Sequence, residues 1–307
     1  MSETLAYALV LTSPPGGGLL GMTEIMAVRG ALQGETVLDE RWLAEGEAWE
    51  ALLARPDNAD EQALKARIAD ALPLPQIDIN VVGADLATRR KKLLIADMDS
   101  TIIGQECIDE MGDVLGIRDE IAGITERAMR GELDFEGAMR ARMALLAGLA
   151  DADLQAIFDT RITLTPGART LVRTMRQFGA FTALVSGGFT FFTRRVAEVV
   201  GFDTDRANVL LVRDGRLTGA VAEPILGREA KLAALQAFTR ERGLHPVETL
   251  AVGDGANDLA MVKAAGLGVA FRAKPVVAAE AQASITHGDL TALLYLQGYA
   301  QADFATD

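Results

Sequence analysis

The stretch KKLLIADMDSTII, residues 91–103, decides the fold and raises the chemical question. Its residues 93–96 are apolar enough for a buried strand, and they lead directly into two aspartates, Asp97 and Asp99. Burying a carboxylate without a partner is costly. Aspartate and serine also cap helices well, but the apolar run ahead of these two aspartates favours a chemical role.

Composition limits the possible functions. The chain has 307 residues, half of them apolar, and a net charge of −13. This length suggests about two domains, and the acidic balance argues against a nucleic-acid-binding protein, which normally needs a basic face. The lone cysteine, Cys107, excludes an intrachain disulfide and fits a reducing compartment. Glu3 stands where a signal peptide carries a basic residue, and no apolar run is long enough to cross a membrane, so we expect a soluble cytoplasmic protein.

Residues 1–84 predict a small α+β domain. Strands are expected at 5–11, 35–43 and 76–82, and helices at 18–33 and 61–71, whereas 47–54 is compatible with a strand or a helix. Within this domain GGGLLG, residues 16–21, has the glycine spacing of a dinucleotide site. The parallel strand that such a site requires is missing downstream, so this segment is interpreted as a turn and helix start.

Residues 85–307 predict a doubly wound parallel sheet, because apolar strands alternate with helices. A hairpin turned at Asp214-Gly215 is expected within 208–222. A helical block at about 104–164 interrupts the alternation and is a candidate lid, or cap, over the first strand. The expected strands are 93–97, 180–188, 249–255 and 267–271, and the expected helices are 108–115, 120–129, 135–146, 151–158, 167–179, 189–201, 228–243 and 257–266.

Three strands of this region end in polar sequence: ADMDST at 96–101, VSGG at 185–188 and VGDGAND at 252–258. Ligands bind open α/β sheets beyond the carboxyl ends of the strands. If the three strands are neighbours, one crevice gathers Asp97, Asp99, Ser186, Asp254 and Asp258. Four carboxylates in one crevice invite a hard divalent cation, and a site made of oxygen ligands favours Mg²⁺.

DMDST, then SGG, then the lysine of GREAK, then GDGAND resemble the four-part signature of the haloacid dehalogenase (HAD) superfamily of phosphohydrolases. The resemblance implies a HAD-like Rossmannoid core. It implies that Asp97 is a nucleophile that forms an aspartyl-phosphate, a covalent intermediate that splits one difficult step into two. Asp99 is then the acid/base, and Ser186, the Gly187 amide and Lys231 hold the phosphate.

The same resemblance implies a magnesium site. Its ligands are the Asp97 carboxylate, the Asp99 backbone carbonyl and Asp254, while Asp258 orients the waters of the metal and Asn257 lines the pocket. Mg²⁺ lets one anion approach another and holds the phosphoryl oxygens. A helix lysine is usually solvated, so the role of Lys231 depends on the order of the four motifs.

The helical block further resembles the phosphoserine phosphatase family, in GQECIDEMGDVLGI and FEGAMRAR. The resemblance implies that Glu106 pairs with a substrate ammonium and Arg142 with its carboxylate, for which a planar guanidinium is suited. Met129 and Phe135 match the apolar residues that close over the site. The expected activity is Mg²⁺-dependent hydrolysis of O-phosphoserine to serine and phosphate, the last step of serine biosynthesis.

Alternatives stay open at this point. The substrate could be another small phosphomonoester such as phosphothreonine or homoserine phosphate, the reaction could be phosphotransfer, or the chain could be a non-enzymatic amino-acid sensor. Residues 1–84 are similar to ferredoxin-like, ACT-like regulatory modules, which suggests feedback by serine or a role in a homodimer. Cys107 has no histidine partner in the sequence and is expected to pack in the cap.

Overall fold

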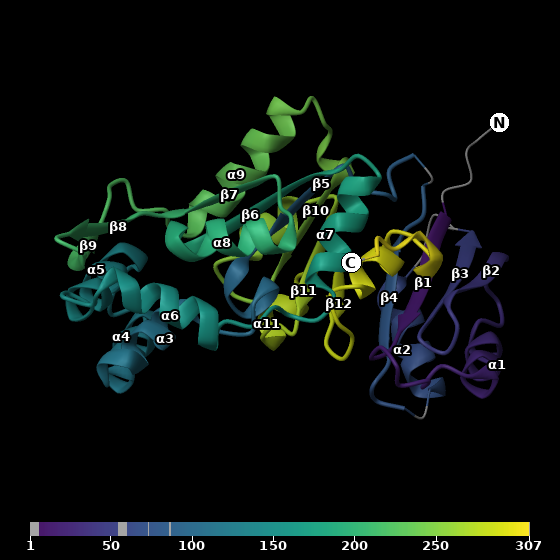
Figure 1. The fold of residues 1–307 in the computed structure, drawn as a ribbon. Helices are drawn as coiled ribbons and strands as arrows, with labels where there is room; N and C mark the ends of the chain where they lie inside the picture. Colours follow the sequence, from purple (N-terminus) through teal and green to yellow (C-terminus); the bar gives the residue numbers. More distant parts are fainter. Residues whose placement is uncertain (1–5, 55–59, 73, 86, 307) are drawn as a thin grey trace.

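The computed structural model describes residues 6–54, 60–72, 74–85 and 87–306, except for the side chain of Met129. It consists of an N-terminal antiparallel sheet, a central parallel sheet between helices, and a group of helices at the far end from the N-terminus (Figure 1). The predicted fold class, an α/β protein with a parallel sheet, is confirmed.

The N-terminal sheet is antiparallel, with strand order β2-β3-β1-β4. Residues 48–54 form a strand, which decides between the two readings left open by the sequence. The predicted helix 18–33 is too long at its start, because Gly16 and Gly18 have positive φ angles and keep the chain in a turn. The elements are β1 (Ala6–Thr12), α1 (Met22–Ala31), β2 (Val37–Ala44), β3 (Ala48–Ala54), α2 (Glu61–Ala71) and β4 (Asp78–Gly83).

Both faces of the N-terminal sheet are covered, which explains why β1 is apolar on both sides. Leu9 and alternate residues pack in one cluster with α1 and α2. Ala8 and Val10, on the opposite face, belong to the same cluster as α12 (Ala292–Leu296) of the central part. A large apolar interface of this kind fixes two parts of a chain relative to each other.

Polar groups also join the two parts. Asn80 of β4 donates to the Ser284 carbonyl at 3.0 Å and accepts from the Ser284 amide at 2.8 Å. The Asp78 carboxylate accepts hydrogen bonds from the backbone amides of residues 286, 287 and 288. The buried side chains of Asn80 and Asp78 therefore have hydrogen-bond partners across this contact, as is usual for buried polar groups.

The central sheet has six parallel strands in the order β12-β11-β10-β5-β6-β7. Two edge strands, β7 and β12, are short and were not predicted. The strands are β5 (Leu93–Ala96), β6 (Phe181–Phe189), β7 (Thr204–Asn208), β10 (Thr249–Gly253), β11 (Leu267–Phe271) and β12 (Ala283–Ile285), and the further helices are α7 (Ala168–Gln177), α8 (Thr190–Val200), α9 (Arg228–Glu241), α10 (Leu259–Ala264) and α11 (Pro275–Ala278).

Successive residues of β5 face opposite helical layers. Leu93 and Ile95 share a cluster with residues of α9 and α10, whereas Leu94 and Ala96 share one with residues of α7 and α8. Strands buried on both faces are expected in a parallel sheet covered by helices. The apolar run ahead of the two aspartates is therefore the central strand of a doubly wound sheet.

Four cap helices follow β5: α3 (Cys107–Leu115), α4 (Arg118–Met129), α5 (Phe135–Leu145) and α6 (Asp151–Arg161). They agree with the four predicted helices. A hairpin of β8 (Leu210–Arg213) and β9 (Arg216–Val221) reaches from the central part to α5 (Figure 1). Its turn lies at Asp214 and Gly215, both with positive φ as a two-residue hairpin turn requires, which confirms the predicted hairpin.

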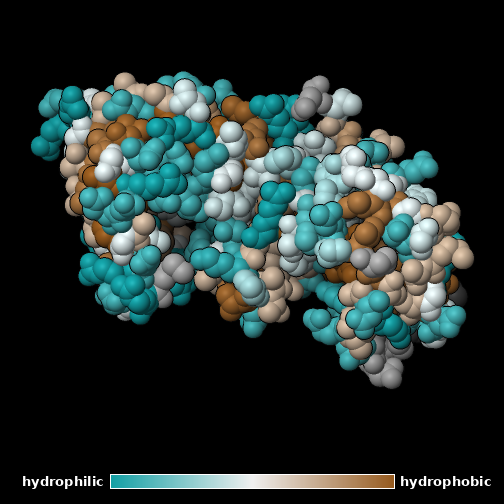
Figure 2. Space-filling model, turned by 90° about the horizontal axis from the view of Figure 1, so that it is seen from below, coloured by the Kyte–Doolittle hydropathy of each residue, from teal (hydrophilic) through white to brown (hydrophobic). Residues whose placement is uncertain are grey.

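The molecular surface mixes hydrophilic residues with smaller apolar patches on the face shown in Figure 2. Within the described part of the chain, every helix is too short or too polar to pass through a bilayer.

Candidate active site

The three polar strand ends lie side by side, as the sequence analysis required. β5 pairs with β10 on one side and with β6 on the other. Asp97 extends the ladder, because its backbone amide donates to the Val252 carbonyl at 3.0 Å. Ser186 lies near the end of β6, and Asp254 directly follows β10. Parallel pairing therefore brings residues more than 150 positions apart to one edge of the sheet.

Three carboxylates converge at this edge. One oxygen each of Asp97, Asp254 and Asp258 lies within 4.8 Å of the others. Asp97 and Asp258 are 5% and 0% exposed. The Lys231 ammonium lies 2.5 Å from Asp97 Oδ2 and 2.5 Å from Asp258 Oδ1. The structure thus brings together the predicted nucleophile, the predicted lysine and two of the predicted metal residues.

Three carboxylates face one ammonium in this crevice, and burial together with the excess of negative charge raises the pKa values of Asp97 and Asp254. Burial and then the Asp258 charge raise the pKa of Asp97 well above its usual range, although Lys231 opposes this. Burial and the Asp258 charge raise the pKa of Asp254 to about 6. Burial acts to lower the pKa of Lys231, but the two carboxylates beside it more than offset this and raise it. One lysine therefore leaves the cluster short of positive charge.

The donor set suits a hard divalent cation. Carboxylate oxygens are the ligands that Mg²⁺ prefers, and Asp97, Asp254 and Asp258 offer theirs within a short distance of one another. Asp258 is already bound on both oxygens, since Oδ1 accepts from Lys231 and Oδ2 accepts from the Gly255 amide at 3.0 Å. Asp97 is bound in the same way, since Oδ1 accepts from the Met98 amide at 2.7 Å and Oδ2 faces Lys231, so these bonds alone give no order of ligands among the three carboxylates.

The Asp99 carboxylate is bound by groups outside this cluster. It accepts hydrogen bonds from the Cys107 amide at 3.0 Å and from the Ser186 hydroxyl at 3.1 Å. Burial raises the pKa of Asp99, while these hydrogen bonds act to lower it. Ser100, directly after Asp99, has φ +54°, an uncommon value for a residue other than glycine.

Ser186 and the two glycines after it form a tight loop beside Asp99. The Gly188 amide donates to Ser186 Oγ at 2.8 Å. A Cβ atom at Gly188 would lie 3.0 Å from Asp99 Oδ2 and 3.1 Å from Ser186 Oγ, so a side chain there would press on both groups. Glycine lets the backbone come this close without displacing either group.

Glu106 and Arg142 face the crevice from the cap helices. Glu106 precedes α3, accepts a hydrogen bond from Ser100 Oγ at 2.7 Å, and has a pKa raised to about 7 by burial and then by Asp99. Burial lowers the pKa of Arg142, opposed by the charges of Asp109 and Glu106. Among the described residues, Arg142 has no ion pair within 4 Å; its guanidinium donates to the Ala138 carbonyl at 3.3 Å and to Thr125 Oγ1 at 3.4 Å. It is available to an anion.

Phe135 covers the end of β6. A Cβ atom at Gly187 would lie 3.4 Å from its ring, and one at Gly227, just before α9, would lie 3.3 Å from it. Asn257 is half-buried between Asp254 and Asp258, and its amide oxygen folds back towards Gly255. Met129 is the last residue of α4, and its side chain lies outside the described residues.

Cys107 packs as expected. It is 1% exposed, and burial followed by the charge of Asp99 raises the pKa of its thiol. A thiol with a raised pKa is a poor nucleophile.

Two residues at the site were not singled out from the sequence. Thr101 is fully buried and donates to Asp254 Oδ1 at 3.3 Å, which joins the first motif to the last. It stands inside the quoted DMDST motif, so a signal was present. Asn208 ends the unpredicted strand β7 and bonds to Gly187, and nothing in its neighbourhood in the sequence indicated this.

Comparison with known proteins identifies relatives. The family model of haloacid dehalogenase-like hydrolases matches residues 94–263. A phosphoserine phosphatase of Streptomyces coelicolor is 44% identical over 244 residues, which cover 80% of this chain and 59% of the relative. One of Polaromonas sp. is 44% identical over 227 residues, covering 72% of this chain and 96% of the relative. The chain therefore matches about three fifths of the length of the Streptomyces protein.

A solved structure extends the similarity to nearly the whole chain. The unliganded crystal structure of a probable phosphoserine phosphatase from Vibrio cholerae has a TM-score of 0.77 and 29% sequence identity, and the match covers 98% of this chain and 88% of that one.

Proposed function

The chain belongs to the haloacid dehalogenase-like hydrolase family, and from this premise we propose that it hydrolyses O-phosphoserine to serine and inorganic phosphate. The observation that carries the proposal is the meeting of Asp97, Lys231 and Asp254 at the end of β5, under cap helices that present Glu106 and Arg142. Relatives named phosphoserine phosphatase support the choice of substrate.

Asp97 is the nucleophile in this proposal. A carboxylate oxygen of Asp97 bonds to phosphorus as the bond between phosphorus and the serine oxygen breaks, and Asp99 gives its proton to the departing alkoxide. In the second step Asp99 takes a proton from water. The water oxygen then bonds to phosphorus, the bond to Asp97 breaks, and phosphate leaves. The raised pKa of Asp99, caused by burial, supports its role as a proton donor.

The phosphate is held by Ser186, the Gly187 amide and Lys231. Phosphoryl transfer depends on positioning and on neutralising charge, and the proximity of Lys231 to Asp97 supports its role as a positive group next to the reacting oxygen. Mg²⁺ is the proposed cofactor, with Asp97, Asp254 and the Asp99 carbonyl as ligands and Asp258 and Asn257 beside them. When bound, it neutralises charge on the phosphoryl group.

The cap residues account for the amino-acid part of the substrate. Glu106 has its pKa raised by burial and by negative neighbours, so a bound ammonium would relieve an unfavourable charge. Arg142 is free to form a bidentate pair with a carboxylate. Phe135 lies over Gly187, which supports the proposal that it and Met129 exclude water from the reacting groups.

The remaining proposals concern the whole chain. We propose two domains, 1–84 and 85–307, with the cap inserted at about 104–164, and a cytoplasmic protein. Feedback by serine through residues 1–84 and a homodimer stay predictions. If deletion of residues 1–84 leaves inhibition by serine unchanged, the prediction of feedback through these residues is wrong.

The test is phosphate release from a panel of esters, with Mg²⁺ and with EDTA. O-phosphoserine is expected to give a kcat/KM at least about tenfold above that of phosphothreonine and homoserine phosphate, since a pocket rejects an extra methyl or methylene modestly. Serine and phosphate should appear in equal amounts. Activity on phosphothreonine alone would show that phosphothreonine, and not O-phosphoserine, is the substrate. A phosphorylated alcohol in place of free phosphate would show that the reaction is phosphotransfer and not hydrolysis.

Arg142→Lys sharpens this test. It keeps the charge and removes the fork geometry, so kcat/KM should fall for O-phosphoserine and stay unchanged for p-nitrophenyl phosphate, which has no carboxylate. An equal fall in kcat/KM for both esters would mean that Arg142 does not recognise the substrate carboxylate.

A further inference from the structure

Asn208 is a buried amide at the end of β7, and the reaction described above does not use it. It is 2% exposed. Its side-chain NH₂ donates to the Gly187 carbonyl at 2.9 Å and to the Leu226 carbonyl at 3.3 Å, and its oxygen accepts from the Leu226 amide at 2.7 Å. One side chain therefore joins three separate strands and loops through both its donor and its acceptor.

Each partner of Asn208 belongs to a segment that holds the phosphate. Gly187 lies near the end of β6, and its amide is proposed to bind the phosphate. Leu226 is followed by Gly227, which precedes α9, the helix that carries Lys231. Phe135 lies against Gly187 and Gly227. The relative positions of the amide, the lysine and the covering ring thus depend on the two loops that Asn208 joins.

Asn208 also stands at the base of the β8–β9 hairpin, which is bound to the cap helices and their loops. The Gly148 amide donates to the Leu217 carbonyl at 2.8 Å, the Leu217 amide to the Leu149 carbonyl at 2.8 Å, and the Asp151 amide to the Gly215 carbonyl at 3.0 Å. The chain enters the hairpin directly after Asn208 and returns at Leu226. Asn208 therefore closes the hairpin at the point where it meets the central part.

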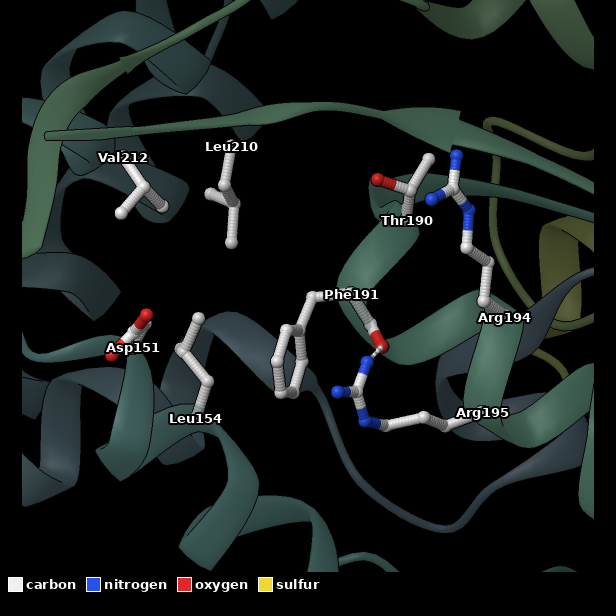
Figure 3. Close-up of a pocket in the computed structure, with 8 residues that line it drawn as sticks. All are labelled: Asp151, Leu154, Thr190, Phe191, Arg194, Arg195, Leu210 and Val212. Atoms are coloured by element: carbon white, nitrogen blue, oxygen red, sulfur yellow. Dashed lines mark hydrogen bonds between the residues drawn. The ribbon is translucent and has the colours of Figure 1, made fainter. Parts of the chain in front are cut away.

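The hairpin stands apart from α8 beyond this base. A hollow of about 320 Å³ lies between β8, α6 and α8, lined by Leu210 and Val212 on one side and by Phe191 and Arg194 on another (Figure 3). Arg195 lies across from α6 and donates to Gln155 at 2.9 Å. The cap and hairpin contact the central part at separate points around this hollow: Phe135 lies against Gly187, Arg195 bonds to α6, and Asn208 joins the base of the hairpin to Gly187.

We propose that Asn208 is a positioning residue that fixes the Gly187 amide relative to the start of α9, so that the phosphate site keeps its geometry independently of the cap-bound hairpin. The inference rests on the proposed function only in taking phosphate as the group held there. It predicts a defect in holding phosphate itself, common to all phosphate esters, rather than a defect in recognising the amino-acid part.

The experiment compares Asn208→Ala with Arg216→Ala in the full chain. Arg216 bonds the hairpin to the cap through the Gly148 carbonyl at 2.8 Å, far from the base, and is the matched control. Binding of inorganic phosphate is measured by calorimetry with Mg²⁺ present, and kcat and KM are measured for O-phosphoserine and p-nitrophenyl phosphate. Asn208→Ala should weaken phosphate binding about tenfold and lower kcat by about 10–100-fold for both esters, because small misplacement of reacting groups is costly. Arg216→Ala should bind phosphate like the wild type.

The outcomes separate the two proposals. If the wild type does not turn over O-phosphoserine but Asn208→Ala still weakens phosphate binding, the proposed substrate fails and the positioning role stands. The positioning role is overturned if Asn208→Ala binds phosphate and turns over both esters as well as the wild type does. It is also overturned if the wild type does not bind phosphate. If Asn208→Ala does not fold, Asn208→Asp keeps the bond from the Leu226 amide and loses the two donated bonds. The same weakening of phosphate binding is then expected, and wild-type binding overturns the inference.

Discussion

Buried acidic residues occur in two regions of this molecule, and only in one of them is their charge balanced by partners. At the contact between the N-terminal sheet and the central part, Glu50 is fully buried between Arg41 and Arg89, with 2.6 Å to the first. Both arginines also donate to backbone carbonyls, those of Gly298 and Leu296. Asp78, close by, is held by three backbone amides.

The crevice at the end of β5 has no such balance. Asp97, Asp99, Asp254 and Asp258 share one lysine, Lys231, and the pKa values of the first three are raised by burial. A buried charge that is fully paired holds a fold in one arrangement, whereas breaking such a pair is strongly destabilising. A group of like charges without enough partners lowers the stability of the fold, and a bound ligand of opposite charge relieves this cost. The contrast predicts different responses to the same kind of mutation.

The largest expected effect is that of Asp97→Asn on activity. Loss of the nucleophile should lower kcat by about 10⁴-fold or more, while the melting temperature stays equal or rises, because one of several repelling carboxylates is gone. Phosphate release and thermal unfolding measure the two effects. Glu120→Gln, an exposed cap residue, is the control and should change neither. Activity within tenfold of the wild type would remove Asp97 from the mechanism.

Removal of divalent cations should have the next largest effect. EDTA is expected to lower the rate on the order of a thousandfold, since several kcal/mol of charge stabilisation is lost, and Mg²⁺ should raise the melting temperature by mass action. The pKa of Asp254 is raised to about 6, so this carboxylate is ionised only above about pH 6. The Mg²⁺-induced shift in melting temperature should therefore become smaller as the pH falls below about 6. An undiminished shift in Asp254→Asn would contradict this site.

Glu50→Ala should reverse the pattern seen at Asp97. It leaves Arg89, which is 7% exposed, without its buried partner, and the free energy of unfolding should fall by about 3–5 kcal/mol. The kcat of the folded fraction should not change. Urea unfolding measures the first and steady-state kinetics the second. Glu50→Gln, which keeps the shape and some hydrogen bonds, should cost less. A loss of kcat without loss of stability would end the comparison.

Lys91 lies between the two extremes and gives the smallest effect. It is buried, and its ammonium donates to the Thr88 and Val247 carbonyls at 2.7 and 2.8 Å. Burial lowers its pKa to about 8, so between pH 8 and its ordinary value the folded chain binds fewer protons than the unfolded one. Stability should therefore rise with pH in this window, by up to about 3 kcal/mol.

Unfolding of the wild type and of Lys91→Met, measured from pH 7 to 10.5, isolates this contribution. The difference in stability between the two proteins should change across the window and be constant below it. A constant difference throughout would mean that the Lys91 pKa is not lowered in the folded chain.

The crevice was predictable from the sequence, while the balanced contact was not. Asp97, Asp254 and Ser186 each follow or end an apolar strand, and parallel strands bring such ends together whatever the chain between them does. Glu50 and Asp78 stand in ordinary strands. Asp78 has partners up to 210 positions away, and Glu50 pairs with Arg41 and Arg89, 9 and 39 positions away. No local pattern in the sequence indicates these contacts.

The short edge strands escaped prediction for a related reason. β7 has the polar sequence TDRAN and β12 has only three residues, so neither presents an apolar run like those of β5, β10 and β11. Asn208 ends β7, so its hydrogen bonds to Gly187 and Leu226 were missed together with the strand. The start of α1 was placed too early because GGGLLG contains apolar residues that extend a helical pattern, although glycines with positive φ prevent a helix there.

Asn80 has a consequence for how the molecule behaves among its own copies. β12 ends the central sheet, and an uncovered edge invites pairing with strands of other molecules and hence aggregation. The Asn80 amide offers Ser284 one acceptor and one donor, as a neighbouring strand would, and β4 lies alongside. The N-terminal sheet therefore covers the β12 edge. A chain that lacks residues 1–84 would expose this edge, and we expect it to self-associate.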